Sequence, residues 1–286
     1  MSKKIVVVIP LYKSKISFFE KKSFIQCLIV LKNYDICIVY PNSLDITFYK
    51  FHLKNASVSY SEKHFDDYYF RDINGYNNLM LSVNFYQQFI DYSFLLLYQL
   101  DAYIFKDNLK EWCNKSYAFI GAPIHDDILT IIEQKYLSDF ETGIKKSISF
   151  MNGGFSLRHI QNTINLLQIK EQRIQLLLNK NWPEDMIITL LLGEDNNNLP
   201  SKCEAANFAF EAHPRDAYKT NLKQLPTGCH GWYRNDFGIH DNMFWFKHII
   251  PVYYYKIQFL NQFQHIFMKY AKRLNRFVNY LRFSNN

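Results

Sequence analysis

The first forty residues contain two uninterrupted runs of β-branched and other apolar side chains, at positions 4–10 and 35–40. A run without polar alternation is typical of a strand that is buried on both faces of a parallel sheet. The residues between the runs include a segment with helical character at 24–32. Strand, helix and strand at this spacing predict a βαβ unit at the start of an α/β fold.

The pattern farther along the chain predicts further elements of the same kind. The predicted strands cover residues 92–100 and 117–121, and the predicted helices cover 77–91, 109–114, 186–192, and a stretch that opens at 152–158 and runs to about 179. A polar segment at 126–147 is interpreted as a mobile flap. We therefore expect one α/β domain over residues 1–241, followed by a tail at 242–286.

Composition places the chain among globular, intracellular proteins. It has 286 residues, 48% of them apolar, which is enough for a sizeable core. Charged residues interrupt every apolar stretch before it reaches the roughly 20 residues that a bilayer-spanning helix needs. The five cysteines are odd in number and form no Cys-x-x-Cys pair. We expect a reduced protein of the cytoplasm without a transmembrane helix.

The formal net charge of +7 belongs to the tail. No acidic residue follows Asp241, and the seven basic groups beyond it leave 26 basic and 26 acidic residues before it. A neutral main domain argues against a nucleic-acid partner. In the tail, apolar positions from 260 to 281 recur every three or four residues, which predicts a basic amphipathic helix. Such a helix either binds an anionic membrane surface or packs on protein.

Three positions carry carboxylates that suit a ligand site. Asp101 ends an apolar strand, and the carboxyl edge of an α/β sheet is where such folds bind ligands. There it either binds a cation or ribose, or caps a turn. Glu184 and Asp185 begin a helix, where acidic residues are also favoured by the helix dipole. The functional alternative is a general base beside Trp182, whose ring offers a sugar a stacking surface.

Two glycine-containing segments add backbone contacts and a histidine. Asn152, Gly153 and Gly154 form either a tight turn or a loop whose amides approach a phosphate or sugar hydroxyl before a helix. His230 lies between Cys229 and Gly231. It is a candidate metal ligand or phosphate contact, although a structural histidine is the better interpretation from the residues alone.

The order of these segments resembles a bacterial and fungal domain family of unknown function that is grouped with GT-A-type glycosyltransferases. The resemblance rests on segments spread over roughly residues 5–235. They are Asn74-Gly75-Tyr76-Asn77, Tyr98-Gln99-Leu100-Asp101, Ile120-Gly121-Ala122-Pro123, Asn152 to Arg158, Pro183-Glu184-Asp185 and Gly228 to Trp232. It implies a GT-A-like fold, which has a mixed, mainly parallel sheet flanked by helices, and a nucleotide-sugar donor with a glycan or lipid-linked acceptor.

The same resemblance implies roles for individual residues. Donor contacts are expected from Pro10, Asn74, Tyr76, Asn77, Gln99, Asp101 and Tyr103, and acceptor or donor contacts from Asn152, Gly153, Gly154 and Trp182. Asp185 falls where inverting members carry their base, with Glu184 orienting it or holding the acceptor. Asp101 and His230 fall where a divalent cation, Mn²⁺ or Mg²⁺, is held.

One departure from the family pattern concerns the third position of the Asp-x-Asp motif, which here is Tyr103. It puts metal dependence in question, and it is the main argument for a rival interpretation. In that interpretation the chain is a carbohydrate- or nucleotide-binding module that keeps the fold without turnover.

Overall fold

The computed structural model describes residues 4–125, 149–195, 198–234 and 239–257. By contacts the chain divides into two compact units, residues 1–234 and 235–286. In the second unit a helix, α12 (Ile239–Ile249), is followed by a further helical turn up to residue 257. The expected flap at 126–147 and the amphipathic stripe from 260 lie outside the described residues.

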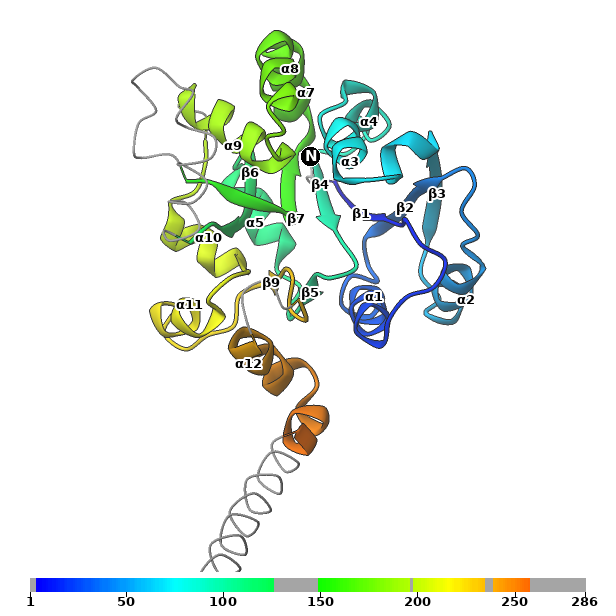
Figure 1. The fold of residues 1–286 in the computed structure, drawn as a ribbon, viewed down its shortest axis with the longest axis vertical. Coiled ribbons are helices and arrows are strands. Elements are labelled where there is room, and N and C mark those ends of the chain that lie inside the picture. The colour runs from blue at the N-terminus through cyan, green and yellow to red at the C-terminus, as the bar shows by residue number, and fades with distance from the viewer. Residues whose placement is uncertain (1–3, 126–148, 196–197, 235–238, 258–286) are drawn as a thin grey trace, which may run out of the picture. The chain divides into compact units, whose positions relative to one another are not determined.

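A six-stranded sheet forms the centre of the first unit (Figure 1). Its strands, in spatial order, are β3 (Tyr60–Phe65), β2 (Asp35–Pro41), β1 (Ile5–Pro10), β4 (Phe94–Tyr98), β7 (Met151–His159) and β6 (Phe119–Pro123). The first four are parallel to one another, and β7 runs antiparallel to both β4 and β6. The structure confirms the expected mixed, mainly parallel sheet.

Helices surround this sheet, and their side chains complete the core. The helices are α1 (Phe18–Val30), α2 (Thr47–Asn55), η1 (Asp67–Phe70), α3 (Ile73–Met80), α4 (Val83–Gln87), α5 (Leu109–Lys115), α7 (Ile160–Ile169), α8 (Glu171–Asn179), α9 (Glu184–Glu194), α10 (Lys202–Phe208) and α11 (Pro214–Thr220). A small second sheet joins β5 (Tyr103–Ile104), β9 (Gly228–Cys229) and β8 (Ala209–Phe210). It brings the segment around residue 230 to the residues that follow β4.

The βαβ prediction is confirmed because both apolar runs become fully buried central strands. Helix α1 begins earlier than expected, at a capping box in which Ser17 and Glu20 exchange hydrogen bonds. The single helix predicted over 77–91 is two short helices, α3 and α4, separated at Leu81 and Ser82.

The prediction of a helix opening at 152–158 is wrong, since these residues belong to β7. Helical structure begins only at α7, after His159. The strand alternates Phe155 and Leu157 with Ser156 and Arg158, a period of two that the preceding glycines obscure. The paired glycines are therefore extended strand residues and not a turn.

Within the described residues, no helix combines the length and the hydropathy that crossing a bilayer requires.

Candidate functional site

A cavity of about 500 Å³ opens at the carboxyl edge of the sheet, where β1 and β4 end. Pro10 and Gln99 form its floor at the strand ends, as expected for a ligand site in an open α/β sheet. Its aromatic lining residues are Tyr12, Tyr69, Phe70, Tyr76 and Tyr233, and its charged lining residues are Lys13, Glu20, Arg71, Asp72, Asp101 and Arg234. Rings combined with three basic side chains suit an anionic ligand that has a flat, partly apolar part.

The basic residue Lys13 is held at this cavity by a buried partner. Its ammonium forms an ion pair with Glu20, a residue that is 2% exposed and fixed by the capping box of α1. Burial would lower the pKa of Lys13, but the hydrogen bond to Glu20 raises it above its usual value. Lys13 therefore presents a constant positive charge to the cavity.

Asp101 lies between two basic side chains. Its Oδ1 is 3.1 Å from Nε2 of His230, and its Oδ2 is 3.6 Å from Nη1 of Arg234. Burial would raise the pKa of Asp101, but the charge and hydrogen bond of His230, together with Arg234, lower it to about 2. Asp101 is therefore an ionised carboxylate at any physiological pH.

His230 is oriented by acceptors on both ring nitrogens. Its Nδ1 is 2.8 Å from Oε1 of Glu211, and its Nε2 lies 3.1 Å from both Asp101 Oδ1 and Gln99 Oε1. Burial would lower the pKa of His230, but Asp101 and Glu211 raise it to about 10. The side chain is an imidazolium that connects the two carboxylates.

Gly154 allows this histidine to lie directly against strand β7. A Cβ atom at position 154 would overlap with Nε2 of His230 and would come within 2.7 Å of Gln99 Oε1. The Gly154 carbonyl accepts a hydrogen bond from the Gln99 amide, and its amide donates to Asn152 Oδ1. The glycine is required for close approach, since its φ is not positive.

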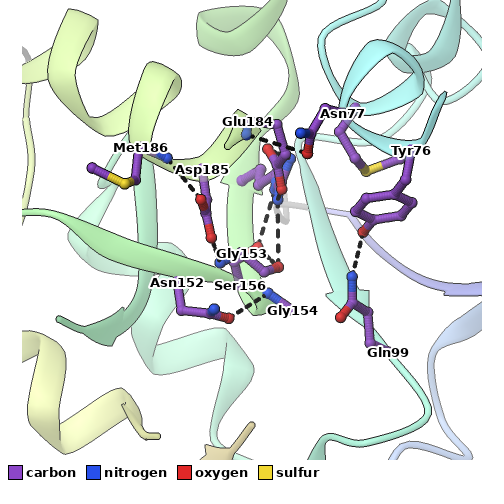
Figure 2. A network of polar contacts seen from close by, with 12 residues as sticks. Tyr76, Asn77, Gln99, Asn152, Gly153, Gly154, Ser156, Glu184, Asp185 and Met186 are labelled. Carbon is purple, nitrogen blue, oxygen red and sulfur yellow. Dashed lines mark hydrogen bonds and ion pairs between the residues drawn. The ribbon is translucent and has the colours of Figure 1, made fainter. Parts of the chain in front are cut away.

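Gln99 carries the network to the cavity wall. Its Nε2 donates a 2.7 Å hydrogen bond to the hydroxyl of Tyr76, which projects from α3 (Figure 2). Burial raises the pKa of the Tyr76 hydroxyl, so it stays protonated and keeps one proton to donate. Gln99, Tyr76 and Asp101, which are among the residues for which the resemblance implies donor contacts, all line the cavity.

Gly153, the neighbour of Gly154, contacts Asp185 through its backbone amide. The Gly153 amide donates to Asp185 Oδ2 at 2.8 Å, and the Met186 amide donates to Oδ1 at 2.8 Å. In Figure 2 the Asp185 carboxylate and the Gln99 side chain lie to either side of the segment Gly153–Gly154. Burial, the neighbouring charge of Glu184 and the charge of Glu211 raise the pKa of Asp185 to about 7.

Both aspartates are therefore connected to the segment Gly153–Gly154 of β7, Asp185 directly and Asp101 through His230. Asp185 binds Gly153, and Asp101 reaches Gly154 through His230. Glu211 acts on both Asp185 and His230. These distant segments meet at β7, but Asp185 is not among the residues that line the 500 Å³ cavity, whereas Asp101 is.

Glu184 has a different place from the one expected of it. It is 4% exposed and forms a bidentate ion pair with Arg158, with distances of 2.8 and 3.1 Å. A buried carboxylate that is engaged in a bidentate ion pair is not available to bind an acceptor. The expectation that Glu184 contacts the reacting groups is therefore corrected.

Three other expected contacts are also corrected. Trp182 is 0% exposed and offers no ring face to a sugar. Tyr103 is buried in β5 with its ring against Phe105 and Trp232, and it does not line the cavity. Asn77 is buried and accepts a hydrogen bond from the Glu184 amide at 3.4 Å, so it supports the start of α9.

Asn74 is exposed and does not line the cavity either. Its carbonyl accepts from the Asn78 side chain within α3.

Several residues of the site were missed from the sequence. Tyr12, Lys13 and Arg234 line the cavity, and Glu211 and Arg158 order its carboxylates. The position of Tyr12 and Lys13 directly after the first strand was an available signal, because ligands bind at strand ends. Nothing in the local pattern distinguishes Arg158 or Glu211 from surface residues.

Among the described residues there is no group of three or more His, Cys, Asp and Glu side chains arranged to hold a metal ion. What is present is a smaller donor set, made of Asp101 Oδ1, His230 Nε2 and Gln99 Oε1. Glu211 binds the opposite nitrogen of His230, which is the arrangement that commonly orients a metal-binding histidine. Because His230 is an imidazolium, a cation would bind its Nε2 only by displacing the proton there, and it would take its remaining ligands from a diphosphate and water.

A mixed, mainly parallel sheet with a polar site at its carboxyl edge defines an α/β protein, in agreement with the fold that the resemblance implied. The chain belongs to the DUF5672 family, described as a protein of unknown function, whose sequence profile matches residues 59–230. The predicted membership of a family of unknown function is thereby confirmed. No curated protein matches the chain.

Several solved structures are similar to the chain at low sequence identity. The apo form of mouse xyloside xylosyltransferase 1 has a TM-score of 0.49 and 11% identity, over 83% of this chain and 99% of that chain. The apo structure of the bifunctional glycosyltransferase WbbM has a TM-score of 0.47 and 12% identity, over 90% and 52%. The Mn/GDP form of core-mannan synthase A from Aspergillus fumigatus has a TM-score of 0.45 and 8% identity, over 71% of each chain.

Proposed function

We propose that the chain is a glycosyltransferase that moves a sugar from a nucleotide-diphosphate donor to a hydroxyl of a glycan or lipid-linked acceptor, with inversion at the anomeric carbon. One observation carries the proposal. Asp185, with a pKa near 7, accepts a hydrogen bond from the Gly153 amide, and the permanently ionised Asp101 pairs with His230, which lies against Gly154. Asp101 lines a cavity with aromatic and charged walls. Two carboxyl groups with such different pKa values suit different roles in one reaction.

The cavity is proposed as the donor site. Aromatic rings such as Tyr12 and Tyr233 suit a nucleobase, and Lys13 and Arg234 suit the diphosphate. A volume of about 500 Å³ lies within the usual range for small-molecule sites. Asp101 and Gln99 at the strand ends are placed to accept hydrogen bonds from ribose or sugar hydroxyls.

Asp185 is proposed as the general base. Its carboxylate takes the proton from the acceptor hydroxyl, and the resulting oxygen attacks the anomeric carbon while the bond from that carbon to the diphosphate oxygen breaks. The leaving diphosphate gains negative charge, which Arg234 and Lys13 in the cavity wall would stabilise, with the imidazolium of His230 behind Asp101. The proton ends on Asp185, whose raised pKa favours that state.

Asn substitution at Asp185 tests the role of the base. Asp185→Asn keeps an oxygen for one of the two backbone amides but cannot accept a proton. We expect transfer to fall by roughly 10²-fold to 10⁴-fold, with donor binding retained. Transfer is measured by acceptor glycosylation and binding by the rise in melting temperature over a panel of nucleotide sugars. Turnover at the wild-type level would remove Asp185 from this role.

A divalent cation is part of the proposal. Asp101 and His230 would hold it on the protein side, with Gln99 beside them. When bound, Mn²⁺ or Mg²⁺ supplies Lewis-acid stabilisation of the leaving diphosphate. The donor panel is therefore measured with Mn²⁺, with Mg²⁺ and with a chelator. Equal stabilisation and transfer in the chelator would exclude the cation and leave the leaving-group charge to His230 and Arg234.

The rival function is a carbohydrate- or nucleotide-binding module without turnover, favoured by Tyr103 at the third position of the Asp-x-Asp segment. It shares the cavity but needs no base. Donor-dependent stabilisation without transfer or hydrolysis of any nucleotide sugar, unchanged in Asp185→Asn, would identify it.

The tail is proposed to bind the anionic cytoplasmic face of a membrane, where a lipid-linked acceptor would be found. The proposal is supported by the charge pattern alone, since residues 242–286 carry seven basic groups and no acidic ones. Full-length protein with Lys269, Lys272, Arg273 and Arg276 replaced by Glu should lose co-sedimentation with phosphatidylglycerol vesicles. Equal sedimentation of the two proteins, or equal sedimentation with neutral vesicles, would count against an electrostatic membrane role.

A further inference from the structure

A fully buried arginine lies next to the proposed base. Arg158, on β7, is 0% exposed. Its guanidinium forms two parallel hydrogen bonds to Glu184, from Nη2 to Oε1 at 2.8 Å and from Nη1 to Oε2 at 3.1 Å. This bidentate geometry fixes both side chains in direction as well as in distance.

The remaining hydrogen-bond donors of Arg158 are also used. Nη1 donates to the Tyr86 hydroxyl at 2.8 Å, Nε donates to Ser156 Oγ at 3.0 Å, and Nη2 donates to the Gly153 carbonyl at 3.4 Å. Because a guanidinium has five N–H groups, this set leaves none of them unpaired. The ring of Phe119 lies 5.1 Å from the guanidinium carbon, on its face.

These contacts close a ring around Asp185. Arg158 binds Glu184, which precedes Asp185 in the chain, and Arg158 also binds the carbonyl of Gly153. The amide of that same Gly153 donates to Asp185 Oδ2. Ser156 forms a second hydrogen-bonded path between Arg158 and Gly153, because its hydroxyl accepts from Arg158 and donates to the Gly153 carbonyl at 2.7 Å. Figure 2 shows Gly153, Ser156, Glu184 and Asp185 of this network, between β7 and the start of α9.

The ring has no room for a side chain at Gly153. A Cβ atom there would lie 2.5 Å from Glu184 Oε1 and 2.7 Å from Arg158 Nη2. The same glycine therefore allows the ion pair to form and presents its amide to the base.

Stability alone does not explain this arrangement. A buried ion pair pays a large desolvation cost, and replacing it by apolar residues is often neutral or stabilising. What the pair does provide is a fixed geometry for everything bound to it. The element that it fixes is the first turn of α9, which carries Asp185.

We propose that Arg158 is a positioning residue for the transfer reaction, which holds the Asp185 carboxylate in place through Glu184 and Gly153. The inference rests on the proposed function of Asp185 as the base. The ionised groups around Asp185 are Glu184 on α9, Arg158 on β7 and Glu211 after β8. Glu184 is the largest charge effect that raises the pKa of Asp185, so the pair controls protonation as well as position.

Two substitutions separate position from protonation. Arg158→Lys keeps the positive charge but loses the bidentate fork, so we expect kcat to fall at least about tenfold with the KM for donor unchanged. Glu184→Gln removes the negative charge next to Asp185. We expect the pKa of Asp185 to fall by about one to two units, seen as an acid limb of kcat/KM displaced to lower pH.

The pKa of Asp185 is also measured directly, by ¹³C NMR of the labelled carboxyl group. This measurement needs no substrate, so it reports on the ring even if no nucleotide sugar is turned over. A wild-type protein without any transfer would refute the proposed function, whereas the NMR shift tests Arg158 and Glu184 separately. Should Glu184→Gln fail to fold, Arg158→Met combined with Glu184→Gln removes both charges, and the pKa of Asp185 is still expected to fall.

The matched control is Glu194→Gln. It is the same substitution at the other end of α9, and Glu194 also pairs with an arginine, Arg173, at 2.6 Å on the surface. We expect wild-type kcat and pH dependence. A wild-type kcat in Arg158→Lys, together with an unmoved pKa of Asp185 in Glu184→Gln, would reduce the buried pair to a structural role and overturn the proposal.

Discussion

Asp101 and Asp185 are the same residue type on the two sides of one pair of glycines, and their surroundings give them opposite properties. Asp101 lies between His230 and Arg234, which lower its pKa to about 2. Asp185 has no such basic partner in the part of the chain that the structure describes, and it lies beside Glu184 and Glu211, so burial and these charges raise its pKa to about 7. The charge of the neighbours decides the difference, because burial raises the pKa of both carboxyl groups.

The comparison assigns chemistry to each side. An aspartate that stays ionised from pH 4 upward suits a constant electrostatic or ligand-binding role. One with a pKa near the physiological range suits proton transfer, because both of its states are accessible. We therefore expect changes in pH and in the two glycines to affect the two sides separately.

A change of pH is expected to give the largest difference between the effect on catalysis, through Asp185, and the effect on donor binding, through Asp101. Asp185 acts as a base only when it is deprotonated, so its activity is present above its pKa of about 7 and is lost as pH falls below it. We expect kcat/KM to fall about tenfold per unit below pH 7, or about a hundredfold at pH 5. Donor binding should stay constant from pH 5 to pH 8, because Asp101 keeps its charge over that range.

Steady-state rates and nucleotide affinity measured at the same pH values check this expectation. A parallel loss of donor affinity and rate would mean that the two aspartates titrate together, and the distinction between them would not hold.

The sequence predicted well the strands of the sheet and the positions of the two aspartates along the chain. The runs at 4–10 and 35–40 could be assigned because strands buried on both faces leave an uninterrupted apolar signal. Asp101 could be located at the carboxyl edge for the same reason, since it directly follows such a run. Asp185 was found by its place at the start of a helix and by family resemblance.

The sequence could not predict which side chains face a ligand. Trp182 and Tyr103 are aromatic residue types that often line sugar-binding sites, but both are buried here. Whether an aromatic ring is buried depends on its tertiary neighbours, which the local sequence does not show. The paired glycines suggested a turn, because positive φ is the commonest reason for glycine. Their actual reason, contact with His230 and Glu184, involves partners 30 or more residues away and leaves no local pattern.

Substitution of the two glycines is a second way to affect catalysis and donor binding separately, with a smaller expected difference. In Gly153→Ala the new methyl group meets Glu184 and Arg158, and in Gly154→Ala it meets His230 and Gln99. Overpacking of this kind costs about 1–3 kcal/mol of unfolding free energy. We expect Gly153→Ala to lower kcat by moving Asp185, and Gly154→Ala to weaken donor binding by moving His230.

Denaturant unfolding gives the cost of each glycine substitution, and kinetics with donor titration gives the rest. The matched control is Gly121→Ala on β6, where a Cβ would overlap with the Asn152 carbonyl, so a steric cost is expected without direct contact with either aspartate. Identical kinetic effects of Gly153→Ala and Gly154→Ala would show that the two sides are not independent.

A further expected effect concerns the pH dependence of stability. The folded-state pKa of Asp185 lies above its unfolded value of about 3.8, so the native protein binds the extra proton between these two values. Stability from this group is therefore complete below pH 4 and is lost as pH rises to 7, above which the cost is constant. Asp185→Asn cannot ionise and does not pay that cost. We expect the melting temperature of Asp185→Asn, relative to wild type, to rise between pH 4 and pH 7 and then to level off. The altered hydrogen bonds of the asparagine add the same offset at every pH, so they do not change this trend. A difference that is independent of pH, measured by thermal unfolding in matched buffers, would mean that Asp185 is ionised at low pH like Asp101.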